Sequence, residues 1–245
     1  MGSEAALLLV SLRVVLVASA GAAALASCQR APEPVRAADH TAFFLWAGVE
    51  APPDLTKAKT VYLLAGEVRA GGPARFVPLR AIPHTRQAAI WLAVRVERLD
   101  WDDALYGRVI ADLARWEAAG NRVAGLQVDF DARTRGLADY AAFLTGLRRR
   151  LPPRYRLSAT GLLDWSAGGD PRALASLAGV VDEVVIQTYQ GRRTIRGYER
   201  YMSSLARLPL TYRIGLVEGG EWREPPEVAR DPEFKGYVVF LLPPG

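Results

Sequence analysis

The chain has 245 residues, of which 50% are hydrophobic, so it can bury the core of one large domain. Its net charge of +5 comes from basic residues scattered along the chain, whereas a nucleic-acid-binding protein clusters them, and we expect no nucleic-acid partner. One cysteine and two histidines exclude a disulfide framework and a zinc site of the usual ligand spacing. An all-carboxylate metal site stays open, but no metal and no cofactor is expected.

The N-terminal segment is typical of a signal peptide. Arg13 is followed by the apolar run VVLVASAGAAALA, which has the length of a signal-peptide core and is too short for a typical membrane span. The run ends in LASC, residues 25–28, which resembles the lipobox of bacterial lipoproteins. That resemblance implies cleavage before Cys28 and a lipid anchor on its thiol. An ordinary secreted protein and an uncleaved anchor are the alternatives.

The segment after Cys28 predicts a linker to a folded domain. Gln29 resembles the residue that sorts lipoproteins to the outer membrane, which implies a location in the cell envelope, on the periplasmic side of that membrane. Residues 29–41, QRAPEPVRAADHT, are rich in proline and charge and predict a tether. We therefore expect a signal peptide over 1–28, a tether over 29–41 and a monomeric folded domain over 42–245.

Short apolar runs with the length of buried strands recur through this domain. There are eight of them, at residues 43–48, 61–68, 89–97, 123–131, 156–165, 181–189, 212–218 and 236–242. Between the runs, residues 102–121 and 134–153 repeat apolar side chains every 3.6 positions and predict helices, and residues 171–180 and 194–208 predict shorter ones. The connections after the first, second and seventh runs are too short or too rich in proline for full helices.

Eight strands that alternate with helices predict a compact (β/α)8 TIM-like barrel with several short or missing helices. An open doubly wound sheet is the alternative. It is disfavoured because no glycine-rich phosphate-binding turn follows the first run, which continues as AGVEAPP.

The strands of this barrel are expected to carry polar side chains on their inner face. In GLQVDFD, residues 125–131, the side chains of Gln127, Asp129 and Asp131 share one face, since side chains alternate along a strand. Polar residues gather toward the strand ends, where the loops of barrel enzymes form the active site. The side chains expected at this end are Trp46, Arg95, Glu97, Gln127, Asp129, Asp131, Asp164, Trp165, Gln187, Tyr189 and Glu218.

Two interpretations of this polar end stay open. In the first, Arg95 neutralises Asp129 in a buried ion-pair network whose remaining hydrogen bonds come from the glutamines. In the second, the residues form a binding or catalytic site, in which the tryptophans stack against the apolar faces of sugars. If Arg95 points between Asp129 and Asp131, it opposes the raised pKa that a catalytic acid needs.

The pair GLQVDFD and VVIQTYQG, following a lipobox, resembles the bacterial family of unknown function numbered 3142 over most of residues 40–245. More distantly, it resembles the fourth-strand and sixth-strand motifs of the family 18 glycoside hydrolases, which are chitinase-like barrels. That resemblance implies Asp131 as the catalytic acid, Asp129 as the carboxylate that orients the substrate, and Tyr189 as a substrate contact. Ala124, Gln127 and Gln190 stand where the family has aspartates, and Asp131 is shorter than the family's glutamate.

Two functions follow from these observations. The first is a glycoside hydrolase of the cell envelope that acts on a polysaccharide, with Asp131, Asp129 and Tyr189 as catalytic residues and the other residues of the polar end binding substrate. The second is a lipid-anchored barrel without catalysis that binds a glycan or serves as a scaffold. Both predict carbohydrate as the ligand and the membrane as a contact through the N-terminal lipid.

Overall fold

The structure is a computed structural model that describes residues 31–49, 53–132 and 134–243. The expected signal peptide and Cys28 lie outside the described residues. Within the described part of the chain, no helix is long and apolar enough to cross a membrane.

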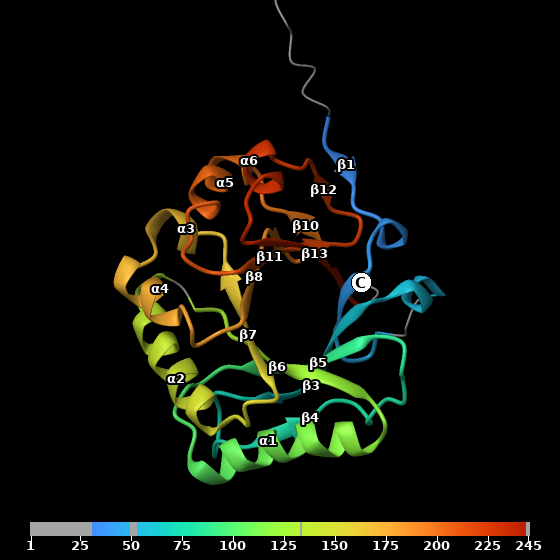
Figure 1. Cartoon of the computed structure of the whole chain (residues 1–245), viewed down its shortest axis with the longest axis vertical. Helices are drawn as coiled ribbons and strands as arrows, with labels where there is room; N and C mark the ends of the chain where they lie inside the picture. The colour runs from blue at the N-terminus through green and yellow to red at the C-terminus, as the bar shows by residue number, and fades with distance from the viewer. Residues whose placement is uncertain (1–30, 50–52, 133, 244–245) are drawn as a thin grey trace, which may run out of the picture. The chain divides into compact units, whose positions relative to one another are not determined.

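Eight parallel strands close into a barrel, as the sequence predicts (Figure 1). They are β2 (Ala42–Leu45), β3 (Thr60–Val68), β5 (Ala89–Val96), β6 (Arg122–Asp129), β7 (Arg156–Leu162), β8 (Glu183–Gln187), β11 (Tyr212–Val217) and β13 (Phe234–Leu241). Each strand pairs with the next one along the chain, and β13 pairs with β2 to close the ring. All eight coincide with the eight apolar runs, so the expected fold class is confirmed.

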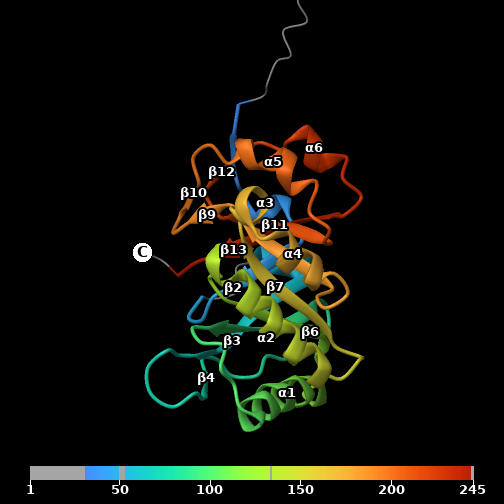
Figure 2. The same ribbon diagram turned by 90° about the vertical axis from the view of Figure 1, so that its left-hand side faces the viewer.

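Helices cover only part of the barrel (Figure 2). They are α1 (Asp103–Ala118), α2 (Leu137–Arg150), α3 (Trp165–Gly168), α4 (Pro171–Leu177), α5 (Glu199–Leu205) and α6 (Pro226–Ala229). The carboxylate of Asp102 accepts a hydrogen bond from the Leu105 amide at 2.8 Å and caps the first turn of α1. A short 3-10 helix, Pro53–Lys57, follows β2, and the antiparallel strand β4 (Phe76–Pro78) follows β3.

Part of the expected tether packs against the barrel domain. Strand β1 (Glu33–Pro34) pairs with β12 (Glu221–Trp222), and the Val35 amide donates to the Gly220 carbonyl at 2.7 Å. The Val35 side chain is buried. Burial of this apolar side chain and pairing of its backbone hold the segment in place, so any tether ends before Glu33.

The strands bury both of their faces. Ile90, Leu92 and Val94 of β5 belong to the outer core, between the barrel and its helices, whereas Trp91 belongs to the core inside the barrel. Aromatic rings fill that interior: the ring centroids of Phe44 and Phe240 lie 4.5 Å apart and those of Tyr62 and Trp91 lie 5.6 Å apart. The expected alternation of inner and outer faces is therefore confirmed for β5.

A layer of polar side chains crosses the interior beside the aromatic rings. Ser158 donates to the Gln127 side-chain oxygen at 3.1 Å, and the Gln127 amide donates to Thr160 at 3.1 Å. Nearer the strand starts, the Tyr62 hydroxyl donates to the Glu183 carboxylate, which also forms an ion pair with Arg213 at 3.1 Å. These buried groups are satisfied by one another, as a packed barrel interior requires.

The close approach of β6 to β7 gives a test of the barrel. A side-chain carbon at Gly125 would overlap the carbonyl oxygen of Arg156, so Gly125→Ala should lower the free energy of unfolding by about 1–3 kcal/mol. The matched control is Gly107→Ala on the exposed face of α1. There the added carbon would lie within 4 Å of no atom beyond the backbone of its own helix, and the change should raise the free energy of unfolding by about 0.5–1 kcal/mol. Urea denaturation of both variants makes the comparison, and equal stabilities would contradict this strand packing.

Candidate functional site

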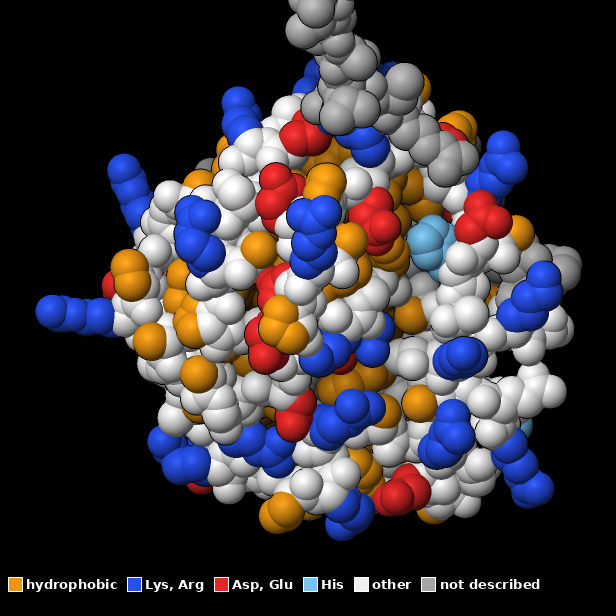
Figure 3. Space-filling view, turned by 45° about the horizontal axis from the view of Figure 1, so that its top comes forward, with side chains coloured by type: hydrophobic (Ala, Val, Ile, Leu, Met, Phe, Trp, Pro, Cys, Tyr) orange, Lys and Arg blue, Asp and Glu red, His pale blue; other side chains and the backbone are white. Residues whose placement is uncertain are grey.

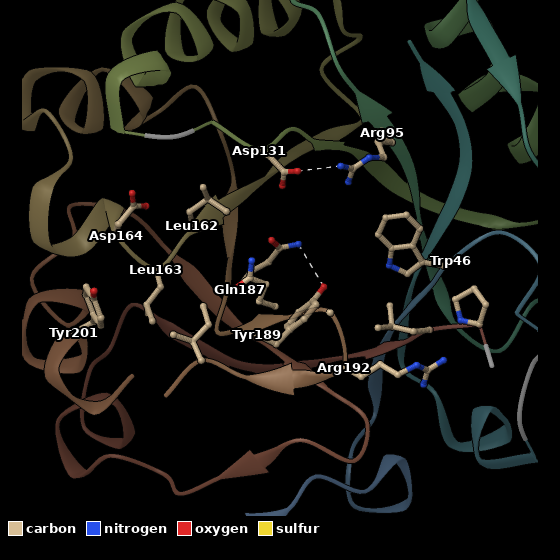
Figure 4. A pocket seen from close by; sticks show the side chains of 15 residues that line it. Trp46, Arg95, Asp131, Leu162, Leu163, Asp164, Gln187, Tyr189, Arg192 and Tyr201 are labelled. Carbon is tan, nitrogen blue, oxygen red and sulfur yellow. Dashed lines mark hydrogen bonds and ion pairs between the residues drawn. The ribbon is translucent and has the colours of Figure 1, made fainter. Parts of the chain in front are cut away.

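A cavity of about 790 Å³ opens at the carboxyl ends of the barrel strands (Figure 4). The loops after the strands form its walls, and the hairpin of β9 (Tyr189–Gln190) and β10 (Arg193–Thr194) borders it. We call this cavity the mouth. Its lining residues are Trp46, Arg95, Asp131, Leu162, Leu163, Asp164, Gln187, Tyr189, Gln190, Gly191, Arg192, Ile195, Tyr201, Leu242 and Pro243.

Arg95 binds both aspartates of the GLQVDFD stretch. Arg95 and Asp129 are register partners on neighbouring strands, and the guanidinium Nη1 lies 3.2 Å from Asp129 Oδ2. Asp131 continues the same face two residues later, and its Oδ2 lies 2.9 Å from Arg95 Nη2. The side chain of Asp129 is 1% exposed and that of Asp131 is 56% exposed. One guanidinium therefore bridges a buried carboxylate and an open one.

Burial is the largest single influence on the pKa values of Asp129 and Arg95. It raises the pKa of Asp129 above its ordinary value, the Arg95 charge opposes the rise, and the Asp131 charge adds to it. Burial also disfavours the charge on Arg95, but attraction by Asp129 and Asp131 outweighs it and raises the pKa of Arg95. Since the pKa of Asp129 is higher in the folded chain than in the unfolded one, its ionised form reduces stability at neutral pH. This loss disappears as the pH falls through the raised pKa.

The sixth parallel strand, β8, adds the amide of Gln187 to the mouth, and β9 adds the phenol of Tyr189. The Gln187 Nε2 donates to the Tyr189 hydroxyl at 3.3 Å. The ring of Tyr189 packs on Phe240, with centroids 4.9 Å apart. Burial, and then the charges of Asp129 and Asp131, raise the pKa of Tyr189 well above 10, so this phenol is neutral and can donate or accept a hydrogen bond.

Six of the expected site residues line the mouth: Trp46, Arg95, Asp131, Asp164, Gln187 and Tyr189. Trp46 lies beside Arg95, whose guanidinium carbon is 5.4 Å from the indole centroid. Gln127 and Asp129 are on the expected inner face, but both are buried beneath the mouth and do not line it.

Three other expected site residues are corrected by the structure. Trp165 is fully buried in the outer core, where its indole N–H donates to the Ala132 carbonyl at 2.8 Å, because the chain turns after β7 and ends the alternation of faces. Glu97 follows the end of β5, and its carboxylate accepts the Ala70 amide at 2.8 Å outside the mouth. Glu218 is exposed after β11 and does not line the mouth either.

The lining residues absent from the sequence prediction come mostly from loops. Gln190 ends β9, and Gly191 and Arg192 form the turn of the hairpin, in which Gly191 has a φ of 57°. The QG dipeptide after a strand was the available signal for this turn, because glycine adopts positive φ without strain. Tyr201 lies on α5, and nothing in its helical spacing shows that its ring reaches the mouth.

No group of three or more metal-binding side chains that could hold an ion occurs among residues 31–49, 53–132 and 134–243.

Comparison with known proteins supports the fold. The xylanase and alpha-amylase inhibitor protein XAIP-II from Scadoxus multiflorus has a TM-score of 0.53 at 8% identity, covering 82% of this chain and 92% of that one. The protein XAIP-I, solved with trehalose, has a TM-score of 0.51 at 10% identity, covering 82% and 93%. The Bacillus cereus spore cortex-lytic enzyme SleL has a TM-score of 0.49 at 19% identity over 72% of this chain, which spans about half of that enzyme's length, 49%.

Curated protein sequences gave no match to this chain. A family model, described as Domain of unknown function (DUF3142), matches residues 84–197, which include both motifs that carried the resemblance. The resemblance expected from the two motifs is therefore confirmed over residues 84–197. The chain is a TIM-like barrel whose residues 84–197 match the DUF3142 domain family.

Proposed function

We propose that the chain binds a polysaccharide of the cell envelope in the mouth without hydrolysing it. The observation that carries this proposal is the bridge from Arg95 to Asp129 and Asp131. The bridge argues against hydrolysis, and the residues that line the mouth indicate the kind of ligand. The likeness to solved structures shows the fold and does not identify a ligand or a reaction.

The bridge opposes the chemistry of a glycoside hydrolase. Such an enzyme needs a carboxylic acid that keeps its proton until it meets the glycosidic oxygen. Asp131 is the carboxylate that faces the mouth, but its Oδ2 lies 2.9 Å from the Arg95 guanidinium and is occupied by that ion pair. Asp129 has the raised pKa of an acid, but its side chain is 1% exposed and lies beneath the lining.

The walls of the mouth suit a sugar. Ligand sites in proteins are concave and mostly apolar, with a few polar groups that fix the ligand's orientation. Here the rings of Trp46, Tyr189 and Tyr201 and five aliphatic side chains provide apolar surface. Gln187, Gln190 and Arg192 provide amide and guanidinium groups of the kind that hydrogen-bond hydroxyl groups. The cavity, about 790 Å³, lies within the range of small-molecule sites.

Hydrolysis is the second candidate, and one observation favours it. Asp131 is more than half exposed at the mouth and follows a second aspartate on the same strand face. A ligand that drew Arg95 away would leave two neighbouring carboxyl groups, and glycoside hydrolases use a pair of carboxyl groups for catalysis.

The test separates binding from turnover. Envelope polysaccharides are titrated into the full chain by calorimetry, and the same mixtures are analysed for new reducing ends. Arg192→Ala should weaken binding about tenfold or more, since a lost hydrogen bond to a charged donor costs about 1.5–3 kcal/mol. The matched control is Arg193→Ala, because Arg193 is the exposed neighbour that does not line the mouth, and it should bind like wild type.

New reducing ends that form with the wild-type chain and vanish in Asp131→Asn would establish hydrolysis and overturn the proposal. Equal losses of affinity in Arg192→Ala and Arg193→Ala would place the ligand outside the mouth.

The LASC motif supports a lipid anchor as the way in which this barrel is held in the cell envelope, on the periplasmic side of the outer membrane. Cys28→Ser should move the chain from salt-washed membranes to the soluble fraction and leave its melting temperature unchanged, because Cys28 precedes the folded domain. Immunoblotting of the fractions measures this. Mass spectrometry that finds Met1 intact in the mature protein would contradict it.

A further inference from the structure

Arg80 differs from the arginines at the molecular surface. Figure 3 shows basic side chains standing out from one face of the molecule, interspersed with acidic ones. Arg80 is half-buried, and within the described residues it forms no ion pair with a carboxylate. Burial lowers its pKa from the ordinary value of an arginine. A guanidinium in such a place needs other hydrogen-bond acceptors, because burying a charged group without partners is costly.

The acceptors of Arg80 are backbone carbonyl groups of two neighbouring strands. Its Nε donates to the carbonyl of Leu64, in β3, at 2.9 Å. Its Nη2 donates to the carbonyl of Leu45, the last residue of β2, at 3.3 Å and to that of Trp46 at 2.7 Å. Strand β4 brings Arg80 to this place, since it pairs with β3 through Pro78. One guanidinium therefore joins the end of β2 to β3.

These bonds begin where the pairing of β2 ends. The last register pair between β2 and β3 is Leu45 with Leu63, and β13 also pairs with β2 only as far as Leu45. Trp46 comes next, so register pairing with a neighbouring strand does not hold its backbone. Its carbonyl instead accepts from Arg80 and, at 3.3 Å, from the Val49 amide. The bond from Arg80 is the shorter of the two, and its donor is charged, which makes it the stronger.

The ring of Trp46 forms one side of the mouth, across from Tyr201 (Figure 4). Its indole nitrogen is buried and has no hydrogen-bond partner in the described part of the chain. The ring contacts the Arg95 guanidinium and packs against Phe44, with ring centroids 6.2 Å apart. Since no side-chain hydrogen bond fixes the ring, its position depends on this packing and on the backbone that Arg80 holds.

We propose that Arg80 is a positioning residue for Trp46, whose ring it holds in place at the mouth before a ligand binds. Arg80 does not line the mouth, so it acts through Trp46 and not through contact with the ligand. A ring that is already ordered costs less entropy on binding than one that the ligand must order. The effect on affinity rests on the proposed binding of a glycan, whereas the effect on the position of Trp46 does not.

Nitrogen-15 relaxation of the indole groups in the free chain tests the positioning. The chain has six tryptophans, and Trp46→Phe identifies the signal of interest. In wild type the order parameter of the Trp46 indole should lie near the value of rigid groups, about 0.85, and in Arg80→Met it should fall below about 0.6. Arg80→Lys keeps the charge but loses the planar fork of donors, so its value should lie between those two.

The matched control is Arg148→Met. Arg148 is also half-buried and lies at the opposite end of the barrel, where it donates to the backbone carbonyls of Leu151, Pro152 and Tyr155. It also pairs with Asp182 at 3.7 Å, so its loss should lower the melting temperature at least as much as Arg80→Met does. The order parameter of Trp46 should nevertheless stay at its wild-type value.

An unchanged order parameter of Trp46 in Arg80→Met, or an equal fall in Arg148→Met, would overturn the proposal. Circular dichroism checks that the variants are folded. If Arg80→Met does not fold, Arg80→Lys takes its place, and the same two outcomes decide.

Calorimetry with the envelope polysaccharide that wild type binds measures the consequence for the ligand. Arg80→Met should weaken binding about two- to tenfold, which corresponds to the cost of ordering one side chain on binding. In a chain that carries Trp46→Ala, the same change should cause no further loss, because the ring that Arg80 positions is gone. An equal loss with and without Trp46 would also overturn the proposal. If no polysaccharide binds, the proposed function is wrong, and the relaxation measurement still decides the role of Arg80.

Discussion

The ion pair that Arg95 forms with two aspartates is the constraint on which the mouth depends. Asp129 is buried at the end of β6, where an unpaired carboxylate would be costly. The neighbouring strand places Arg95 in register with it, and the guanidinium also reaches Asp131 at the mouth. The same contact that makes the buried charge tolerable therefore also occupies the open carboxylate.

Several polar groups of the barrel interior satisfy one another's hydrogen bonds. Near the strand starts, Glu183 joins Tyr62 and Arg213, and farther along Gln127 links Ser158 and Thr160. Aromatic rings fill the remaining space. Because the interior is packed, the room for a ligand on the barrel axis lies at the mouth.

The alternation of apolar runs with helical segments was sufficient to predict the barrel, and the alternation of side chains along a strand predicted the inner face of β6. It places Gln127 and Asp129 inside and Phe130 outside, where its ring packs on Tyr140 with centroids 5.1 Å apart. The rule fails where strands end. Trp165 follows a turn and packs in the outer core. Arg192 lines the mouth because of the hairpin between β9 and β10, which the periodicity of the sequence does not predict. Local pattern also cannot show that one arginine serves two carboxylates, because that depends on strand register.

The titration of Asp129 tests the Arg95 bridge most directly. Carbon-13 NMR of the aspartate carboxyl groups is followed across pH in wild type and in Arg95→Met, with Asp129→Asn to assign the signal. In wild type the pKa of Asp129 should lie above its ordinary value of 3.8, because burial outweighs the attraction of Arg95. It should rise further in Arg95→Met, where burial and the Asp131 charge act unopposed. A pKa that is the same in both chains would show that Arg95 does not hold this carboxylate, and the account of the mouth would be wrong.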